Sequence, residues 1–243
     1  MKPALLKPKS KLLASIGGDR RETSVPSAKP VKATKRQAMA KTPSSRATKA
    51  AERRAAIVQA GLDEFVARGF AATRLEDVAK RAGVAKGTIY LHFTDKEALF
   101  QELVRTALVP LIARMAAPPV AGVAAREMVE RFAETFVRDI AETQRGDILR
   151  LIIAEGARFP SLADFYYREV VARGIAGMQQ LIDFGIANGE IRNPALRDYP
   201  QLVVAPALLA VVWHGLFGRH APLDPLAMLR VHIDLIFGER SAA

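Results

Sequence analysis

Near residue 90, four side chains of different chemistry stand at alternate positions: Lys86, Thr88, Tyr90 and His92. A cation, a hydroxyl, a phenol and an imidazole are groups that suit phosphate oxygens and base edges in a major groove. Gly87 removes a side chain among them, so a helix that begins here could bring its free N–H groups close to a phosphate. The segment therefore predicts a surface for nucleic acid.

Two short helices on either side of Gly83 would present that surface. Thr73 and Glu76 have the spacing of a capping box, in which a hydroxyl and a carboxylate satisfy free backbone N–H groups at a helix start. Gly83 predicts the end of this helix, because glycine accepts the left-handed conformation found there. Its apolar face, with residues three and four positions apart, consists of Leu75, Val78, Ala79 and Ala82.

The second short helix is expected over residues 85–93. Ile89 and Phe93 lie one turn apart and would anchor it inward, which leaves the polar residues named above facing largely elsewhere. Two short helices joined by a tight glycine turn follow the helix-turn-helix plan.

The flanking segments also read as helices. Downstream, Thr94 and Glu97 predict another capping box. Lys96 places a cation in the first turn against the helix dipole, and a nearby phosphate would explain it. Upstream, a helix is expected to run from about Arg46 to Gly69, with one apolar face made of Val58, Leu62, Phe65 and Val66.

The rest of the chain favours further helices, and no segment alternates with a period of two for long enough to predict a strand. Helices are expected near residues 97–115, 123–142, 147–156, 161–188, 198–218 and 225–237. The predicted fold class is therefore all-α.

The run over residues 73–99, TRLEDVAKRAGVAKGTIYLHFTDKEAL, closely resembles the DNA-binding domain of the TetR (tetracycline-repressor) family. The resemblance extends back to Arg53 when the preceding helix is included. Two positions depart from the usual form: Ala85 stands where a serine or threonine is common, and Leu91 where an aromatic or polar residue is common. These departures affect one cap or phosphate contact and the base preference.

The resemblance implies roles for individual residues. Phosphate contacts fall to Thr73, Lys86, Tyr90, His92 and Lys96; the positions nearest the bases are Lys86, Gly87, Thr88 and Leu91; Arg74 is a further candidate. It also implies a homodimeric repressor that leaves a near-palindromic operator when a small apolar effector binds.

The family places a helical ligand-binding and dimerisation domain after this module. Residues 149–160 (LRLIIAEGARFP), with the following Phe165-Tyr166-Tyr167, resemble the C-terminal domain of an AcrR/AefR-like subset. Candidate pocket residues are Phe132, Phe136, Ile152, Phe159, Phe165, Tyr166 and Trp213, although aromatic residues at helical spacing also suit a plain core. The helices near 198–218 and 225–237 would form the dimer interface, or equally a buried core.

The charge distribution sets residues 1–45 apart. Residues 1–50 contain 13 lysines and arginines but only Asp19 and Glu22, whereas the remaining residues are balanced, within a net charge of +11. The segment has too little apolar surface to offset its ordering entropy, and we predict a disordered basic tail. A nucleic-acid-binding arm, a solubilising tail and a transit peptide remain open readings.

Composition bounds the remaining functions. The chain has no cysteine, which excludes disulfides and thiolate metal sites and suits the cytoplasm, or the nucleoid when DNA is bound. Four scattered histidines and the absence of phosphate-loop and dinucleotide motifs favour neither an enzyme nor a cofactor or metal. No apolar run reaches the length of a membrane span.

We therefore expect three segments: a tail at 1–45, a helix-turn-helix domain at 46–99 and an effector and dimerisation domain at 100–243. The main alternative is a basic nucleic-acid-associated protein that binds through its tail without effector control. A second alternative is a ligand-binding protein that has lost its DNA function.

Overall fold

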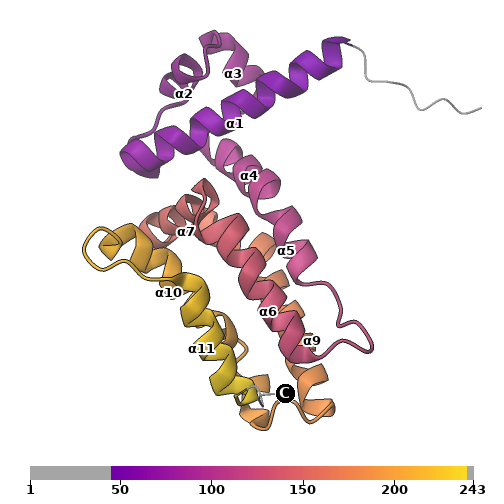
Figure 1. Ribbon diagram of the computed structural model, residues 1–243. Coiled ribbons are helices and arrows are strands. Elements are labelled where there is room, and N and C mark those ends of the chain that lie inside the picture. Colours follow the sequence, from indigo (N-terminus) through magenta and orange to yellow (C-terminus); the bar gives the residue numbers. More distant parts are fainter. Residues whose placement is uncertain (1–44, 240–243) are drawn as a thin grey trace, which may run out of the picture. The chain divides into compact units, whose positions relative to one another are not determined.

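The computed structural model describes residues 45–239, and every regular element in that range is a helix (Figure 1). The predicted disordered tail, apart from Ser45, lies outside the described residues. In chain order the elements are α1 (Ser45–Ala72), α2 (Leu75–Arg81), α3 (Lys86–His92), α4 (Lys96–Ala107), α5 (Val109–Met115), α6 (Ala125–Phe136), the π-helix η1 (Val137–Ala141), α7 (Gln144–Glu155), α8 (Pro160–Tyr166), the π-helix η2 (Tyr167–Val171), α9 (Ala172–Ala187), the 3₁₀-helix η3 (Pro194–Arg197), α10 (Gln201–Phe217) and α11 (Pro225–Phe237).

The all-α prediction is confirmed, and each expected helical region holds a helix or a run of helices. The expected region 97–115 divides into α4 and α5, and the region 161–188 divides into α8, η2 and α9. Of the helices in the described part of the chain, none combines the length and the apolar character that a membrane crossing needs.

Helix α1 is the base against which α2 packs, and α3 packs on α2 in turn. Its apolar face buries Leu62 and Phe65, but Val66 is 52% exposed, so the predicted face was one residue too wide. The backbone kinks at Gly69, where φ is +75°, and the helical stretch proper ends there as expected.

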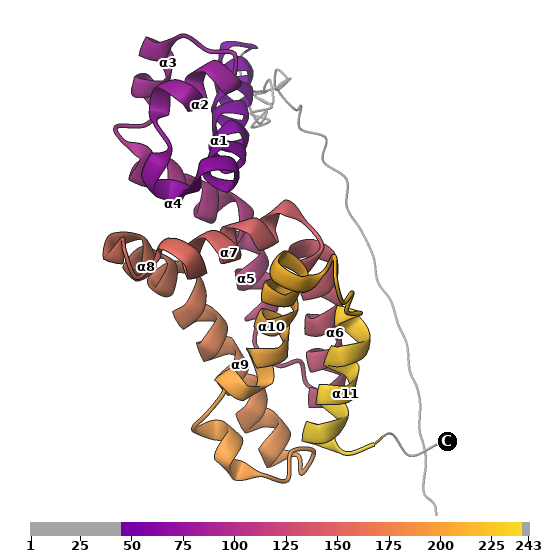
Figure 2. The ribbon, with the colours of Figure 1, turned by 90° about the vertical axis from the view of Figure 1, so that its left-hand side faces the viewer.

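Helix α1 packs against α2, α4 and α7, and α4 in turn packs against α5 and α8. Phe65, Phe70 and Phe100 fill the space between α1 and α4, with 5.4 to 6.3 Å between their ring centroids. Helices α10 and α11 lie side by side in both views (Figures 1 and 2). The core therefore runs without a break from the first helices into the later ones.

Candidate nucleic-acid interface

The outer face of α3 carries the residues that the sequence singled out. Ile89 and Phe93 are buried and anchor the helix as predicted. The Arg54 guanidinium lies 4.7 Å from the centre of the Phe93 ring and covers that anchor. The opposite side presents exposed Lys86, Gly87, Tyr90 and Leu91, with Thr88 and His92 half-buried between them. The helix is thus held by two apolar residues and offers its remaining surface outward.

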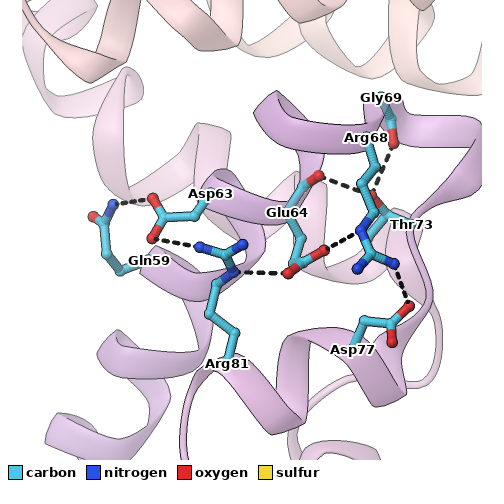
Figure 3. Close-up of polar contacts among 8 residues, drawn as sticks. All are labelled: Gln59, Asp63, Glu64, Arg68, Gly69, Thr73, Asp77 and Arg81. Carbon is cyan, nitrogen blue, oxygen red and sulfur yellow. Dashed lines mark hydrogen bonds and ion pairs between the residues drawn. The ribbon is translucent and has the colours of Figure 1, made fainter.

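A chain of charged groups fixes α2 on α1 (Figure 3). The buried carboxylate of Glu64, which is 4% exposed, pairs with Arg81 Nε at 2.7 Å and with Arg68 Nε at 3.2 Å. Arg68 also reaches Asp77 on α2 at 3.2 Å. The hydrogen bond to Glu64 raises the pKa of Arg81. Two guanidiniums therefore compensate the one buried carboxylate, and its charge stays paired where α1 meets α2.

Thr73 supports the corner between α1 and α2 from inside. Its side chain is 2% exposed, and its hydroxyl donates to the Gly69 carbonyl at 2.8 Å and lies 3.2 Å from the Glu64 carbonyl. Arg74 occupies the N-cap position of α2, without a capping side-chain bond. The predicted Thr73 capping box is therefore wrong: the hydroxyl satisfies carbonyls at the end of α1 instead.

Lys96 is also turned inward. Its ammonium donates to the carbonyls of Phe70 and Ala71, at 2.7 Å each, and lies 4.8 Å from the centre of the Phe70 ring. Burial lowers the pKa of this ammonium below its ordinary value. These free carbonyls at the end of α1 explain why a cation stands at position 96, where the sequence suggested a phosphate.

The N-cap of α4 is Asp95, whose carboxylate accepts from the Ala98 N–H at 2.7 Å. The predicted capping box of Thr94 and Glu97 is therefore wrong by one residue. Asp95, and not Thr94, occupies the N-cap position and binds a free N–H group of the first turn. Glu97 instead accepts from the Ser161 hydroxyl at 3.2 Å.

Glu76 is a functional candidate that sequence reasoning treated only as a cap. Its carboxylate accepts from the Tyr90 hydroxyl at 2.9 Å and lies 3.0 Å from Lys86 Nζ. Its own backbone N–H, then Lys86 and then Tyr90 lower the pKa of Glu76 from 4.5 to about 2. Two outward-facing donors are thus held by one acid, which partly neutralises Lys86.

A largely apolar cavity of about 570 Å³ lies among α5 to α10. Four of the seven predicted pocket residues line it: Phe132, Phe136, Ile152 and Tyr166. The Tyr166 hydroxyl has no hydrogen-bond partner among the described residues, and burial raises the pKa of this phenol. The polar groups of the wall also include Asp164 and Tyr167. This composition suits an apolar ligand.

The other three predicted pocket residues lie elsewhere. Phe159 packs edge-on against Phe70, 4.9 Å between ring centres. Phe165 is buried beneath the Arg105 guanidinium, 4.9 Å away. Trp213 donates its indole N–H to the Ala221 carbonyl at 2.7 Å. These aromatic residues pack in the core or hold a loop. Their spacing in the sequence does not distinguish such roles from that of a cavity wall.

The cavity and the helix-turn-helix meet at the end of α7. Ile152 lines the cavity, and Glu155, one turn later, accepts from the Phe70 N–H at 3.1 Å. Phe159 then contacts the Phe70 ring, as described above. Only three positions along α7 therefore separate a residue of the cavity wall, Ile152, from a residue that binds the segment before α2, Glu155.

The geometry of α2 and α3 is that of a helix-turn-helix module in front of a helical domain with an apolar cavity. Two family profiles match the chain: "Bacterial regulatory proteins, tetR family" over residues 57–103, and "Tetracyclin repressor-like, C-terminal domain" over residues 124–232. The chain belongs to the TetR family of DNA-binding transcriptional regulators. The family consists of regulators and not of enzymes, and its members bind DNA operators and small-molecule effectors, usually as dimers.

Individual relatives agree with this assignment. The HTH-type transcriptional regulator YhgD of Bacillus subtilis (strain 168) is 30% identical over 176 residues, which cover 71% of this chain and 88% of YhgD. The regulator TtgR of Pseudomonas putida is 48% identical over 54 residues, covering 22% of this chain and 26% of TtgR. A TetR-family regulator structure from Rhodococcus sp. superposes with a TM-score of 0.65 at 25% identity, covering 76% of this chain and 99% of that one. The narrower AcrR/AefR-like placement stays a prediction.

Proposed function

We propose that this regulator is a homodimeric repressor that leaves a near-palindromic operator when a small, mainly apolar effector enters the cavity among α5 to α10. The two α3 helices of the dimer would occupy successive major grooves on one side of the duplex. Residues 46–99 would form the DNA-binding domain and residues 100–243 the effector and dimerisation domain.

The proposed DNA contacts are the outward residues of the module: Arg74, Lys86, Gly87, Thr88, Tyr90, Leu91 and His92. Lys86 and Tyr90 would exchange Glu76 for phosphate oxygens, since both donors already lie together at the surface. Leu91 is 85% exposed, and an apolar side chain in this position suits contact with a thymine methyl group. Thr73 and Lys96 would act by holding the corner that positions α2.

One observation carries the effector-responsive part of this proposal. Helix α7 contributes both to the cavity wall and to the attachment of the DNA-binding module, because Ile152 lines the cavity and Glu155 accepts from the Phe70 N–H. An effector that displaces α7 would therefore change the position of the module. The loss of operator affinity equals the difference in effector affinity between the two states.

The dimer is proposed to form through α10 and α11. These helices and the loop between them carry large apolar side chains that are more than a third exposed: Leu202, Leu208, Leu209, Leu216, Phe217, Leu223, Val231 and Leu235. An apolar surface of this extent on neighbouring helices is typical of an interface. A second copy brought together by a two-fold axis would cover it with the same residues.

The test begins with selection of genomic DNA fragments by the full chain, followed by anisotropy titrations on the selected operator. We expect a palindromic sequence and an operator affinity that falls when a saturating effector is added. An operator affinity unchanged by every ligand that binds the cavity would contradict effector release.

A truncation separates this function from binding through the tail. Removal of residues 1–44, which precede α1, should preserve the discrimination between operator and random DNA and reduce the salt slope. If that deletion abolished binding altogether, the alternative of a tail-driven nucleic-acid-associated protein would be correct.

A further inference from the structure

Two further hollows lie beside the apolar cavity among α5 to α10, called the main cavity from here on, toward the loop after α5. A small hollow of about 60 Å³ shares Ile112, Met115, Phe132 and Gly174 with the main cavity. A groove of about 340 Å³ shares Met115, Ala117, Met128 and Phe132 with the small hollow. Neighbouring spaces thus share side chains, and the three lie in a row from the main cavity to the surface between α5 and α6. We call this row the path, and the shared side chains divide it.

The side chains that divide this path are of kinds that can move aside. Met115 and Phe132 are half-buried, and an unbranched methionine adapts its shape more readily than other apolar residues. Gly174 on α9 is shared by the main cavity and the small hollow, and an added Cβ there would meet only Ile112 Cγ2, at 3.9 Å. The absence of a side chain at Gly174 thus keeps free space where a chain-like ligand would have to pass.

The outer groove is cationic, unlike the interior. Its wall includes Arg114, Arg131 and Arg138. Arg131 pairs with Glu127 one turn before it. Arg114 and Arg138, by contrast, share Asp139, at 3.4 and 2.9 Å. Two guanidiniums on one carboxylate carry a net positive charge, on which Glu134 acts only through its charge and not through an ion pair within residues 45–239.

The electrostatics of Asp139 support the same conclusion. Hydrogen bonding to Arg138 and the charges of Arg114 and Arg145 lower the pKa of Asp139 below its ordinary value. Asp139 is thus the anion around which several cations gather, so a second anion in the groove would be attracted. An anionic head in the main cavity would instead meet Asp164.

We propose that the effector is a linear amphipathic anion, with an unbranched apolar chain in the main cavity and a carboxylate or phosphate-bearing head at Arg114 and Arg138. This inference rests on the proposed effector function and specifies its ligand class. The chain passes Met115, Phe132 and Gly174, and the head stays in the outer groove, where it is half in water.

Binding to the full-length protein is measured by calorimetry, below the concentration at which the probes aggregate. Along the series hexanoate, decanoate and tetradecanoate, affinity should rise about three- to fourfold per added methylene until the cavity is full. Tetradecanol, with the same chain and no charge, should bind about tenfold more weakly than tetradecanoate. Equal affinity for the acid and the alcohol, or no dependence on chain length, would overturn the inference.

The two sources of the head are separated by comparing tetradecanoate with its coenzyme A thioester. Tighter binding of the thioester assigns the groove to phosphate groups, and tighter binding of the free acid assigns it to a carboxylate. Either result supports an anionic head, whereas failure of both to bind contradicts it.

Substitutions locate the head. The double variant Arg114→Gln/Arg138→Gln should weaken tetradecanoate about five- to tenfold and leave tetradecanol unchanged, because both arginines are largely exposed and each pair contributes modestly. Arg131→Gln is the matched control and should change affinity at most about twofold, since Glu127 already neutralises Arg131. Equal effects of the two variants would contradict a head at Arg114 and Arg138.

Gly174→Leu locates the chain. A leucine there would fill the small hollow, weaken tetradecanoate by about tenfold or more and flatten the dependence on chain length. Operator binding without ligand and the helical circular dichroism signal show whether this variant is folded. A folded Gly174→Leu protein with unchanged chain-length dependence would contradict the path.

Failure of this inference is distinguishable from failure of the proposed function. If a compact neutral molecule releases the operator while no anionic chain binds, effector release stands and the ligand class is wrong. If anionic chains bind with the pattern above but leave operator affinity unchanged, the ligand class stands and release is wrong.

Discussion

The surface of α3, which we propose binds DNA, and the cavity among α5 to α10, which we propose binds the effector, differ in chemistry. The α3 surface presents exposed donors, and two of them, Lys86 and Tyr90, are held in place by the Glu76 carboxylate. The cavity wall is mostly apolar and includes the buried phenol of Tyr166, whose hydroxyl has no hydrogen-bond partner within residues 45–239. Under the proposed function, the first would select by the direction of hydrogen bonds and by charge, and the second by length and volume. Conditions that weaken one should therefore leave the other nearly unchanged.

Salt should produce the largest difference. Between 50 and 200 mM salt, operator affinity should fall by about a thousandfold, because a dimer that contacts several phosphates releases as many counterions. Effector affinity should change by only a few-fold, since at most one exposed ion cluster takes part. Anisotropy titrations and calorimetry over the same salt range measure the two values. Parallel slopes would mean that the sites are not physically distinct in this way.

Phe159→Ala should disturb the junction between the two regions. Loss of the edge-on contact with Phe70 should lower the free energy of unfolding by about 2 to 3 kcal/mol, because a large apolar side chain leaves a packed site. Effector should still bind, while its effect on operator affinity shrinks. Urea unfolding and anisotropy provide the two measurements. Val66→Ala, on the exposed side of α1, is the control, and an equally large loss there would argue against a special junction.

Lys96→Met tests whether this lysine acts within the fold or on DNA. Loss of the hydrogen bonds to the Phe70 and Ala71 carbonyls should lower the free energy of unfolding by about 2 kcal/mol. The salt slope of operator binding should stay the same. Lys80→Met, on the exposed side of α2, serves for comparison. A slope smaller by about 0.9 per lost contact would show that Lys96 reaches a phosphate.

Glu76→Gln should raise the affinity for random DNA about threefold and steepen its salt dependence, because Lys86 would lose its neutralising partner. Glutamine keeps an oxygen that can accept from Tyr90. Asp77→Asn removes the same charge from the next residue, whose partner is Arg68, and should have little effect. Identical results for the two variants would show that only the net charge of the protein matters, and not the contact between Glu76 and Lys86.

The smallest effect concerns pH. Since the pKa of Glu76 is lowered from 4.5 to about 2, its contacts with Lys86 and Tyr90 are fully present above about pH 4.5 and are lost as the pH falls toward 2. Carbon-detected NMR titration should place the midpoint of the Glu76 carboxyl near 2. In Lys86→Met the midpoint should move up. A midpoint that stays in place would show that Lys86 contributes nothing to the shift.

The helix-turn-helix and the cavity also differ in how much of each could be predicted from the sequence. The anchors Ile89 and Phe93, the end at Gly83 and the outward position of Tyr90 follow from local spacing, which a short helix pair expresses directly. The partners of Thr73, Glu76 and Lys96 did not follow, because they depend on carbonyls and side chains brought together only by folding. Phe159 and Trp213 look like Phe132 in sequence, and only the packing separates a junction, a loop closure and a cavity wall.

Gly69 has a consequence for building chimeras within the family. Its left-handed backbone, with φ at +75°, lies against the Glu155 carboxylate, and a Cβ at this position would come within 2.8 Å of Glu155 Oε1. Position 69 belongs to one half of any hybrid regulator and position 155 to the other. The same carboxylate accepts from the Phe70 N–H, so a module transplanted from this chain onto a foreign sensor half would lose this contact unless that half carries a carboxylate at the position of Glu155.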